Sequence, residues 1–352
     1  MRIRAALVSC PGGPFTVRDV DLAPPRDDEI LVRLTAAGLC HTDLTMRHGW
    51  RRFPMVFGHE GAGVVEAVGE SVTGFAPGDT VCLSYRSCGA CEQCKAGSPA
   101  YCRRSDLNMR GTRADESTPH SLDGAPVYGN FFGQSSLATH ALAYASNTVK
   151  IPADFPSALT APLGCGVQTG AGTVLNVLRP TPGETIAVFG AGAVGLSAVM
   201  AAVALGCDVI VVEPVAARRD LARELGAAAA IDPGDAAAPP TSPAHYAIDT
   251  TGRAGVIGQA VRGLRRRGML ALVGMGGTAE LDIMTVMANG IAVRGVIEGD
   301  ADPATFIPRL IELHRQGKLP LEKIVAEYPF EEVETAARDA ASGRTIKPVL
   351  IF

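Results

Sequence analysis

The sequence predicts an α/β fold whose second half is a parallel, doubly wound sheet, and two observations lead to it. From about residue 155, short runs of Val, Ile and Ala alternate with Ala-rich segments of helical length. Such alternation is typical of parallel sheets joined by helical crossovers. In addition, many of the 40 glycines stand in short turns between these runs, where tight strand–helix connections are expected.

The second half begins with an apolar strand at residues 185–189, a Gly-rich turn at 190–195 and an Ala-rich helix at 196–205. An Ala- and Pro-rich segment, 235–243, is predicted to be a short surface loop. The other expected strands lie at 207–212, 228–231, 246–249, 268–273, 291–295 and 348–352, and the other expected helices at 216–225 and 303–316.

The first third of the chain predicts a separate, strand-rich domain. Its β-branched runs are short and bounded by Gly and Pro, which is typical of strands. A chain of 352 residues is also too long for one compact core, so two domains are expected. The expected strands of this part lie at 3–8, 29–36, 61–68 and 80–83.

Composition narrows the class of partners. Apolar residues make up 47% of the chain and charged residues 19%, and the formal net charge is −4, so no nucleic-acid partner is expected. The short basic run Arg265–Arg266–Arg267 is predicted to be a solvated helix end or turn. Residues 1–10 lack the apolar core of a signal peptide, and the most apolar stretch, 186–205, falls within a strand–turn–helix pattern. We therefore expect a cytoplasmic protein without a membrane span.

The Gly-rich turn carries a dinucleotide-binding pattern. Gly190, Gly192 and Gly195 form GxGxxG between a predicted strand and a predicted helix. The first glycine permits the tight turn, the second lets a pyrophosphate approach the backbone, and the third lets helix and strand pack closely. Glu213 ends the next predicted strand, 18 residues after Gly195, where a carboxylate accepts from ribose hydroxyls and repels a 2′-phosphate. NAD is therefore predicted rather than NADP; the alternative is a plain strand–turn–helix with a surface Glu.

Four of the nine cysteines form a compact metal-binding pattern. Cys88, Cys91, Cys94 and Cys102 read C-x2-C-x2-C-x7-C within 15 residues, which suits a tetrahedral structural zinc. The nearest alternative is an iron–sulfur cluster, but bacterial ferredoxin runs close with C-x3-C-P. Here the last gap is seven residues and Arg103 follows it, so zinc is favoured.

A second constellation pairs cysteine with histidine. Cys40 and His59 lie 19 residues apart, each after a predicted strand or turn. A catalytic zinc needs three protein ligands and one open position, and spacing alone does not identify the third. Cys165 is attractive because it precedes the dinucleotide-binding half, which would place the metal in a cleft between domains. The alternative is a coincidental Cys/His pair.

Together these motifs resemble the zinc-containing medium-chain alcohol dehydrogenase family over nearly the whole chain, and bacterial aryl-alcohol (benzyl alcohol) dehydrogenases most closely. The resemblance implies a GroES-like, partly open β-barrel catalytic domain at residues 1–166 and 298–352, and a Rossmann NAD-binding domain at 167–297. The stretches that carry it are Cys40-His41-Thr42-Asp43, Met55-Val56-Phe57-Gly58-His59-Glu60-Gly61, the four-Cys loop, Phe131-Phe132-Gly133-Gln134-Ser135-Ser136, Leu163-Gly164-Cys165-Gly166-Val167-Gln168-Thr169-Gly170, Gly190–Gly195 and Gly343-Arg344-Thr345-Ile346-Lys347.

The resemblance also implies a role for each residue of the metal site. Cys40, His59 and Cys165 would bind the catalytic zinc. Glu60 would sit behind the metal and ligate it transiently, and Asp43 would hold the ring of His59 by a hydrogen bond.

Further residues would serve the substrate and the cofactor. Thr42 would hydrogen-bond the substrate oxygen and start the proton path, in which Thr45 stands where several members of the family have His. His41 and Lys347 would contact the pyrophosphate. Thr169 would pack near the nicotinamide, and Arg218 would contact the adenosine ribose.

The implied activity is interconversion of a primary, aryl or allylic alcohol and its aldehyde by hydride transfer to NAD, with two zinc ions per chain. Trp50, Phe53 and Tyr85 are candidates for stacking on an aromatic substrate; the alternative is ordinary core packing. A short aliphatic alcohol or a glutathione adduct is the alternative substrate. The resemblance further implies a homodimer or homotetramer that pairs through the cofactor-domain sheet.

Two other classes of protein fit less well. A zinc-free reductase of the same fold would not need Cys40, His59 and Cys165 together. A non-enzymatic zinc module built on the four cysteines would not need the complete βαβ unit.

Overall fold

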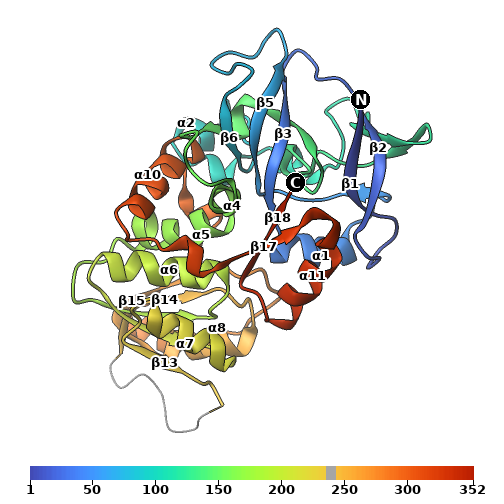
Figure 1. Cartoon of the computed structure of the whole chain (residues 1–352). Coiled ribbons are helices and arrows are strands. Elements are labelled where there is room, and N and C mark those ends of the chain that lie inside the picture. Colours follow the sequence, from blue (N-terminus) through green and yellow to red (C-terminus); the bar gives the residue numbers. More distant parts are fainter. Residues whose placement is uncertain (235–242) are drawn as a thin grey trace. The chain divides into compact units, whose positions relative to one another are not determined.

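The computed structural model describes residues 1–234 and 243–352 and divides the chain into two compact units (Figure 1). Unit 1 comprises Met1–Cys165, Asp302–Ile311 and Leu321–Phe352, and unit 2 comprises Gly166–Ala301 and Glu312–Pro320.

Unit 1 is built on two mostly antiparallel sheets. One has the strand order β4-β1-β2-β7-β8, and the other has the order β10-β6-β5-β3-β18-β17 with β9 also paired to β3. Only β17 and β18 pair in parallel. The strands are β1 (Arg2–Val8), β2 (Thr16–Leu22), β3 (Glu29–Gly38), β4 (Met55–Val56), β5 (Gly61–Val68), β6 (Thr80–Leu83), β7 (His120–Leu122), β8 (Ala125–Val127), β9 (His140–Tyr144), β10 (Thr148–Lys150), β17 (Val325–Pro329) and β18 (Lys347–Ile351).

The sequence of strand β3 is apolar almost throughout because both faces of the strand are covered. Successive side chains of a strand point to opposite faces. Ile30 and Val32 pack in one apolar cluster with residues of β5 and β6, whereas Leu31 packs in another with residues of β1 and β2. Both faces of β3 are therefore covered, which makes it the centre of unit 1.

The helices of unit 1 are short. They are α1 (His41–Gly49), α2 (Glu92–Lys95), α3 (Asp106–Met109), α4 (Ser157–Thr160) and α11 (Val333–Ser342), while α10 (Pro303–Arg315) begins in unit 1 and ends in unit 2.

Unit 2 is the predicted doubly wound parallel sheet. Its six strands have the order β13-β12-β11-β14-β15-β16 and all pair in parallel. Its strands are β11 (Thr185–Phe189), β12 (Asp208–Val212), β13 (Ala229–Ile231), β14 (Ala244–Asp249), β15 (Leu264–Leu272) and β16 (Ala292–Gly295), and its helices are α5 (Gly166–Gly172), α6 (Ala193–Ala204), α7 (Ala216–Glu224), α8 (Ala254–Arg262) and α9 (Ile283–Asn289). The strand order reverses at β11, as in dinucleotide-binding sheets.

The predicted fold class is confirmed, and two details differ. Helix α6 begins at Ala193, because Gly192 already serves as its N-cap. The basic run 265–267 is neither a helix end nor a turn: it lies within β15, exposed to solvent, next to a register shift in the pairing with β14. Of the predicted loop 235–243, residues 235–242 lie outside the described part of the chain.

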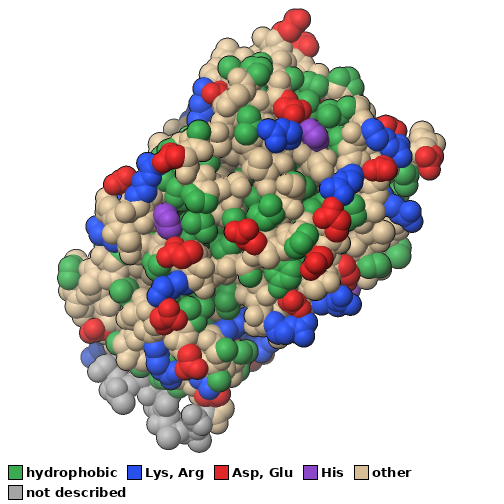
Figure 2. Space-filling view, viewed as in Figure 1, with side chains coloured by type: hydrophobic (Ala, Val, Ile, Leu, Met, Phe, Trp, Pro, Cys, Tyr) green, Lys and Arg blue, Asp and Glu red, His purple; other side chains and the backbone are tan. Residues whose placement is uncertain are grey.

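Two further observations bear on the predicted partners. Acidic and basic side chains are mixed over the visible face of the molecule (Figure 2). Among the described residues, none of the helices combines the length and the apolar character needed to cross a membrane.

Candidate active site

The predicted catalytic ligands meet in unit 1. Ligand atoms of Cys40, His59, Glu60 and Cys165 all lie within 4.8 Å of one another. Cys40 is the N-cap of α1, His59 and Glu60 precede β5, and Cys165 follows a 3₁₀ turn at Ala161–Gly164. Each side chain therefore stands at the end of a regular element, where the backbone holds it in place.

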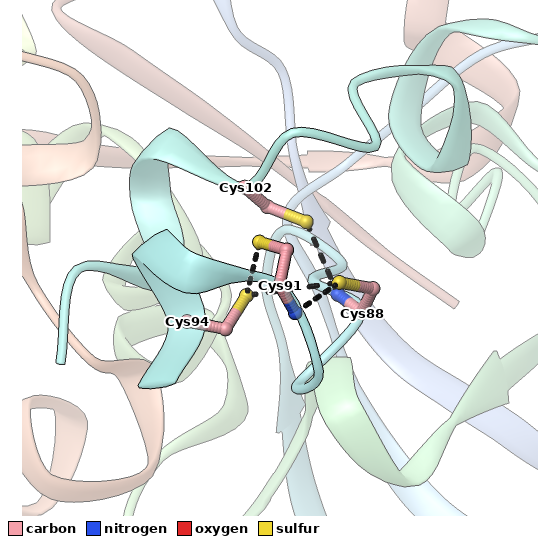
Figure 3. Close-up of side chains that lie close together, drawn as sticks. All are labelled: Cys88, Cys91, Cys94 and Cys102. Atoms are coloured by element: carbon pink, nitrogen blue, oxygen red, sulfur yellow. Dashed lines mark hydrogen bonds between the residues drawn. The ribbon is translucent and has the colours of Figure 1, made fainter. Parts of the chain in front are cut away.

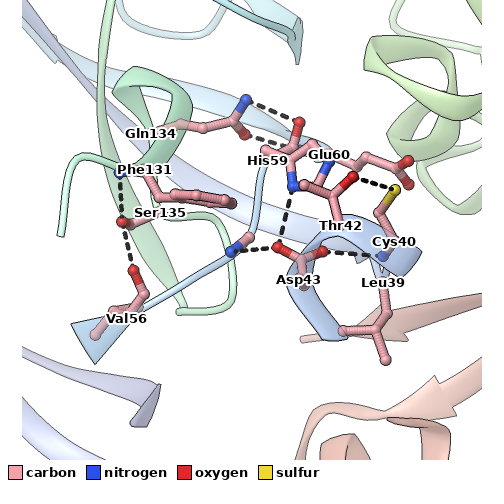
Figure 4. Close-up of polar contacts among 12 residues, drawn as sticks. Leu39, Cys40, Thr42, Asp43, Val56, His59, Glu60, Phe131, Gln134 and Ser135 are labelled. Atoms are coloured by element: carbon pink, nitrogen blue, oxygen red, sulfur yellow. Dashed lines mark hydrogen bonds and ion pairs between the residues drawn. The ribbon is translucent and has the colours of Figure 1, made fainter. Parts of the chain in front are cut away.

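Asp43 joins two of these ligands through its carboxylate. Oδ2 accepts from the backbone N–H of Cys40 at 2.9 Å, and Oδ1 accepts from the backbone N–H of Gly58 at 3.1 Å (Figure 4). Oδ1 also lies 3.0 Å from His59 Nδ1. This contact leaves the other ring nitrogen of His59, Nε2, to face the cluster.

The donor set fits a metal ion. His59 Nε2 is buried and has no hydrogen-bond partner among the described residues. Such an orphaned buried atom is costly unless a ligand pairs with it. The thiol of Cys165, and then the charge of Lys347, hold the pKa of Cys40 well below its usual value against the effect of burial. A thiolate beside a free imidazole nitrogen is the form that binds zinc.

Lys347 is placed differently from the expectation. Its Nζ is buried and lies 2.8 and 2.9 Å from the two carboxylate oxygens of Glu60, so it does not stand free for a pyrophosphate. The reason is its position in β18, which pairs with β3 on one side and β17 on the other. A buried ammonium needs a carboxylate partner, and Glu60 supplies it.

The fit around Glu60 is tight. A Cβ on Gly38 would lie 1.9 Å from Glu60 Oε2, so a larger residue at this position would displace the carboxylate. Burial raises the pKa of Glu60, while the charge of Lys347 opposes that shift. Burial lowers the pKa of Lys347, but the negative charges of Glu60 and Cys40 outweigh it and raise that pKa.

Thr42 stands beside the cluster. Its Oγ1 lies 3.7 Å from Cys40 Sγ, and the residue is half-buried. Its neighbour His41 and the residue Thr45 are both exposed on α1. The helix therefore carries a hydroxyl next to Cys40 and two further polar side chains toward solvent.

Aromatic rings cover the imidazole of His59. The ring of Phe132 stacks on it with centroids 4.6 Å apart, and Phe131 meets it edge-on at 5.6 Å. Trp50 packs against Phe131 within the core, so it belongs to the core rather than to an open pocket. In the sequence, Phe131 and Phe132 stand out only as part of a motif of the resemblance. No periodicity or spacing identifies them as neighbours of His59.

The four other cysteines form the second candidate metal site (Figure 3). Their sulfur atoms lie within 4.8 Å of one another, with Cys91 and Cys94 3.5 Å apart. Backbone N–H groups point at the sulfurs: that of Cys91 at Cys88, and that of Cys88 at Cys102, both at 3.3 Å. N–H donation stabilises thiolates; donation from Arg103 and Cys94 lowers the pKa of Cys91 to about 6.

The Gly-rich turn of unit 2 has the predicted geometry. Gly190 has a φ of +94°, and a Cβ on Gly195 would lie 1.9 Å from the carbonyl oxygen of Gly190. A Cβ on Gly192 would meet nothing within 4 Å, so this glycine faces open space where a ligand has access to the backbone.

The remaining predicted cofactor residues also lie in unit 2. The carboxylate of Glu213 is buried and accepts from the backbone N–H groups of Ala191 at 2.7 Å and Val215 at 2.9 Å. Arg218 is half-buried on α7. Thr169 is buried in α5, with Oγ1 3.5 Å from a carboxylate oxygen of Glu298.

Sequence reasoning also missed Gln134 and Ser84. Both are buried, and their side chains bond to the backbone next to the metal ligands. Gln134 lies in a stretch quoted for the resemblance, but no spacing singles it out, and Ser84 carries no sequence signal.

Comparisons with known proteins identify the family of this chain. Residues 26–153 match the family model of the alcohol dehydrogenase GroES-like domain, and residues 193–314 match that of the zinc-binding dehydrogenase domain. A geraniol dehydrogenase of Castellaniella defragrans is 43% identical over 99% of this chain and 97% of its own.

Two solved structures are similar throughout. An alcohol dehydrogenase zinc-binding domain protein from Burkholderia ambifaria has a TM-score of 0.96 at 43% identity, covering 100% of this chain and 99% of its own. Benzyl alcohol dehydrogenase from Acinetobacter calcoaceticus has a TM-score of 0.95 at 39% identity, with the same coverage of both chains.

Proposed function

The chain belongs to the zinc-containing medium-chain alcohol dehydrogenase family, and from this premise we propose that it interconverts primary allylic or aryl alcohols and their aldehydes, with NAD as the hydride acceptor. The proposal rests above all on one observation: ligand atoms of His59, Cys40 and Cys165 lie within 4.8 Å of one another, and the buried Nε2 of His59 has no hydrogen-bond partner among the described residues. Two cysteines and one histidine are the known ligand set of catalytic zinc in alcohol dehydrogenases.

A bound zinc would supply Lewis acidity, which lowers the pKa of a substrate hydroxyl. Cys40, His59 and Cys165 would hold it, and Asp43 would keep the His59 ring in the tautomer that presents Nε2. Thr42 would receive the hydroxyl proton at Oγ1 and release it toward the exposed side of α1. Glu60, tied to Lys347, would keep a negative charge behind the metal.

Unit 2 would bind NAD, the hydride acceptor. Gly190, Gly192 and Gly195 would form the pyrophosphate turn at the start of α6, a helix N-terminus that favours anions. Glu213 keeps a buried negative charge beside this turn, which disfavours a 2′-phosphate. Residues 1–166 and 298–352 are thus proposed as the catalytic domain and 167–297 as the NAD-binding domain, with His41, Thr169 and Arg218 as further cofactor contacts.

The aromatic surface favours the substrate class. Phe132 lies against the ring of His59 and is half-exposed, so an unsaturated carbon next to the alcohol carbon would find a flat apolar partner. Two of the similar proteins are named for alcohols of this class: geraniol is an allylic alcohol and benzyl alcohol is an aryl alcohol.

A substrate panel tests this proposal. NADH formation is followed by absorbance with geraniol, benzyl alcohol, ethanol and S-hydroxymethylglutathione, each with NAD and with NADP. We expect the highest kcat/KM for geraniol or benzyl alcohol with NAD. A preference for ethanol or for the glutathione adduct would refute the substrate class, and equal use of NADP would refute the role of Glu213.

Two zinc ions per chain are also proposed, the second held by Cys88, Cys91, Cys94 and Cys102. Their half-exposed loop has few regular elements, and a structural zinc stabilises such segments. Metal analysis of the purified protein should find two zinc ions per chain; a single zinc would contradict this proposal.

We also propose a homodimer or homotetramer whose subunits pair through the sheet of unit 2. Strand β16 is an exposed edge of the parallel sheet, and unpaired edges are usually covered. Apolar side chains stand exposed on β16, on α9 and just beyond β16: Ile283, Met284, Met287, Val293 and Ile297. Light scattering of the wild type and of Met287→Asp should show loss of the oligomer in the variant; a monomeric wild type would refute the proposal. The expected cytoplasmic location stays a prediction.

A further inference from the structure

The side-chain amide of Gln134 forms hydrogen bonds with the backbone around the proposed metal site. Gln134 is 1% exposed. Its Oε1 accepts from the N–H of Gly61 at 3.1 Å, and its Nε2 donates to the carbonyl oxygen of His59 at 3.0 Å (Figure 4). Its Nε2 also donates to the carbonyl oxygen of Ser84 at 2.9 Å. Both hydrogens of Nε2 are therefore used, and these contacts fix which end of the amide faces which group.

Ser84 continues this path to the third metal ligand. Its Oγ donates to the carbonyl oxygen of Gly164 at 2.6 Å, and Gly164 directly precedes Cys165. The two backbones are in close contact here, since a Cβ on Gly164 would lie 2.0 Å from the carbonyl oxygen of Leu83. A chain of hydrogen bonds thus runs from His59 through Gln134 and Ser84 to Gly164.

This path complements the role of Asp43. Asp43 joins Cys40 to His59, whereas Gln134 and Ser84 join His59 to the residue before Cys165. His59 and Cys165 come from segments about 100 residues apart in the sequence, so local structure does not set the distance between them. Tetrahedral zinc, however, tolerates only small departures in ligand position.

We propose that Gln134 and Ser84 are positioning residues that set the separation of His59 and Cys165, and so determine how firmly the catalytic zinc is held. The proposal rests on the metal site of the proposed function. Neither side chain is proposed to touch the metal: both act through the backbone of its ligands.

Asn147 provides a matched control because it is a second buried amide in the same region. Its Nδ2 donates to the carbonyl oxygens of Phe132 at 3.0 Å, Gly133 at 3.2 Å and Ser84 at 3.3 Å, and its Oδ1 accepts from the N–H of Tyr144 at 2.8 Å. Its removal also leaves buried groups unpaired. One of these bonds shares the carbonyl oxygen of Ser84 with Gln134, but none reaches the backbone of His59 or Cys165.

The experiment compares Gln134→Met, Ser84→Ala and Asn147→Leu as zinc-loaded proteins. The release of zinc to a chromogenic chelator is followed in time, and the phase that is absent from Cys40→Ser identifies the catalytic site. The absorption bands of cobalt-substituted protein report the ligand geometry, and thermal melting reports the general loss of stability.

We expect Gln134→Met to release the catalytic zinc about 10–100-fold faster than the wild type, with shifted cobalt bands. Ser84→Ala should change both in the same direction by a smaller factor. Asn147→Leu removes only one long contact with Ser84, so it should release zinc no faster than Ser84→Ala even if it melts earlier. Equal release rates for Gln134→Met and Asn147→Leu would overturn the proposal. If Gln134→Met fails to fold, Ser84→Ala decides in the same way: a wild-type release rate in that variant overturns the proposal.

Zinc release from the wild type distinguishes a failure of the proposed metal site from a failure of the positioning role. If wild-type protein lacks the phase that Cys40→Ser removes, the proposed metal site itself fails, and the positioning role falls with it. If that phase is present and the variants leave it unchanged, only the positioning role fails.

Discussion

Replacing Lys347 by methionine tests the buried pair that Lys347 forms with Glu60. The two side chains are 3% and 0% exposed, and Nζ lies 2.8 Å from Oε1 and 2.9 Å from Oε2. Methionine has a similar length but no charge, so Lys347→Met would leave the carboxylate of Glu60 buried without its cation. We expect a large loss of stability.

The size of the loss follows from the burial. Breaking a buried ion pair by removing one partner costs about 3–5 kcal/mol, because the remaining charge is not compensated. Replacing both partners by neutral groups removes the charge as well as the attraction, and costs far less. The double variant Glu60→Gln/Lys347→Met should therefore recover most of the stability that Lys347→Met loses.

Thermal melting of the wild type, the single variant and the double variant measures this, with and without prior removal of zinc. At roughly 2–4 °C per kcal/mol for a unit of this size, Lys347→Met should lower the apparent Tm by on the order of 10 °C. A shift below about 2 °C, or a double variant that melts no higher than the single one, would refute the reasoning. Melting without zinc keeps any change in metal affinity out of the comparison.

Four other outcomes are expected. Cys40→Ser should lose turnover and one of two zinc ions per chain while keeping the melting behaviour of unit 2, and Thr42→Val should lose turnover with both zinc ions bound; wild-type activity in either variant would contradict the assigned role. Burial, together with the charge of Arg113, lowers the pKa of His120 from 6.5 to about 4, so the unfolded chain binds more protons between these values and stability should fall by about 3 kcal/mol as the pH drops through that window. This fall should shrink in His120→Leu, and an unchanged pH dependence of its Tm would argue against the neutral buried ring. Gly195→Ala should abolish NAD binding in a fluorescence titration without loss of zinc, since its Cβ would meet the carbonyl oxygen of Gly190 at 1.9 Å; wild-type affinity would show that the turn adapts.

Much of the site could be predicted where chemistry and spacing are local. The four cysteines between Cys88 and Cys102 lie within 15 residues, so any compact path of that segment brings their sulfurs together. The Gly-rich turn is likewise a local feature, because a strand, three glycines and a helix follow one another directly. Cys165 is different: spacing left it open, and only the resemblance named it as a ligand.

The structure alone revealed the partners of Lys347 and Gln134. Lys347 stands 287 residues from Glu60, and Gln134 stands 75 residues from His59. The sequence indicates neither pair, because the residue type alone does not distinguish a buried lysine from an exposed one. The same holds for Phe132, whose contact with His59 depends on how the loop at residues 130–136 packs onto β5.

The sequence by itself determined the fold class, the positions along the chain of most strands of unit 2 and the residue types able to bind metal, because periodicity and short-range spacing act along the chain. Tertiary structure decided which of those residues converge, which charges are buried and what pairs with them. The physical reason is that burial turns a polar group without a partner into a cost of several kcal/mol, and only the packing of distant segments determines where that cost arises.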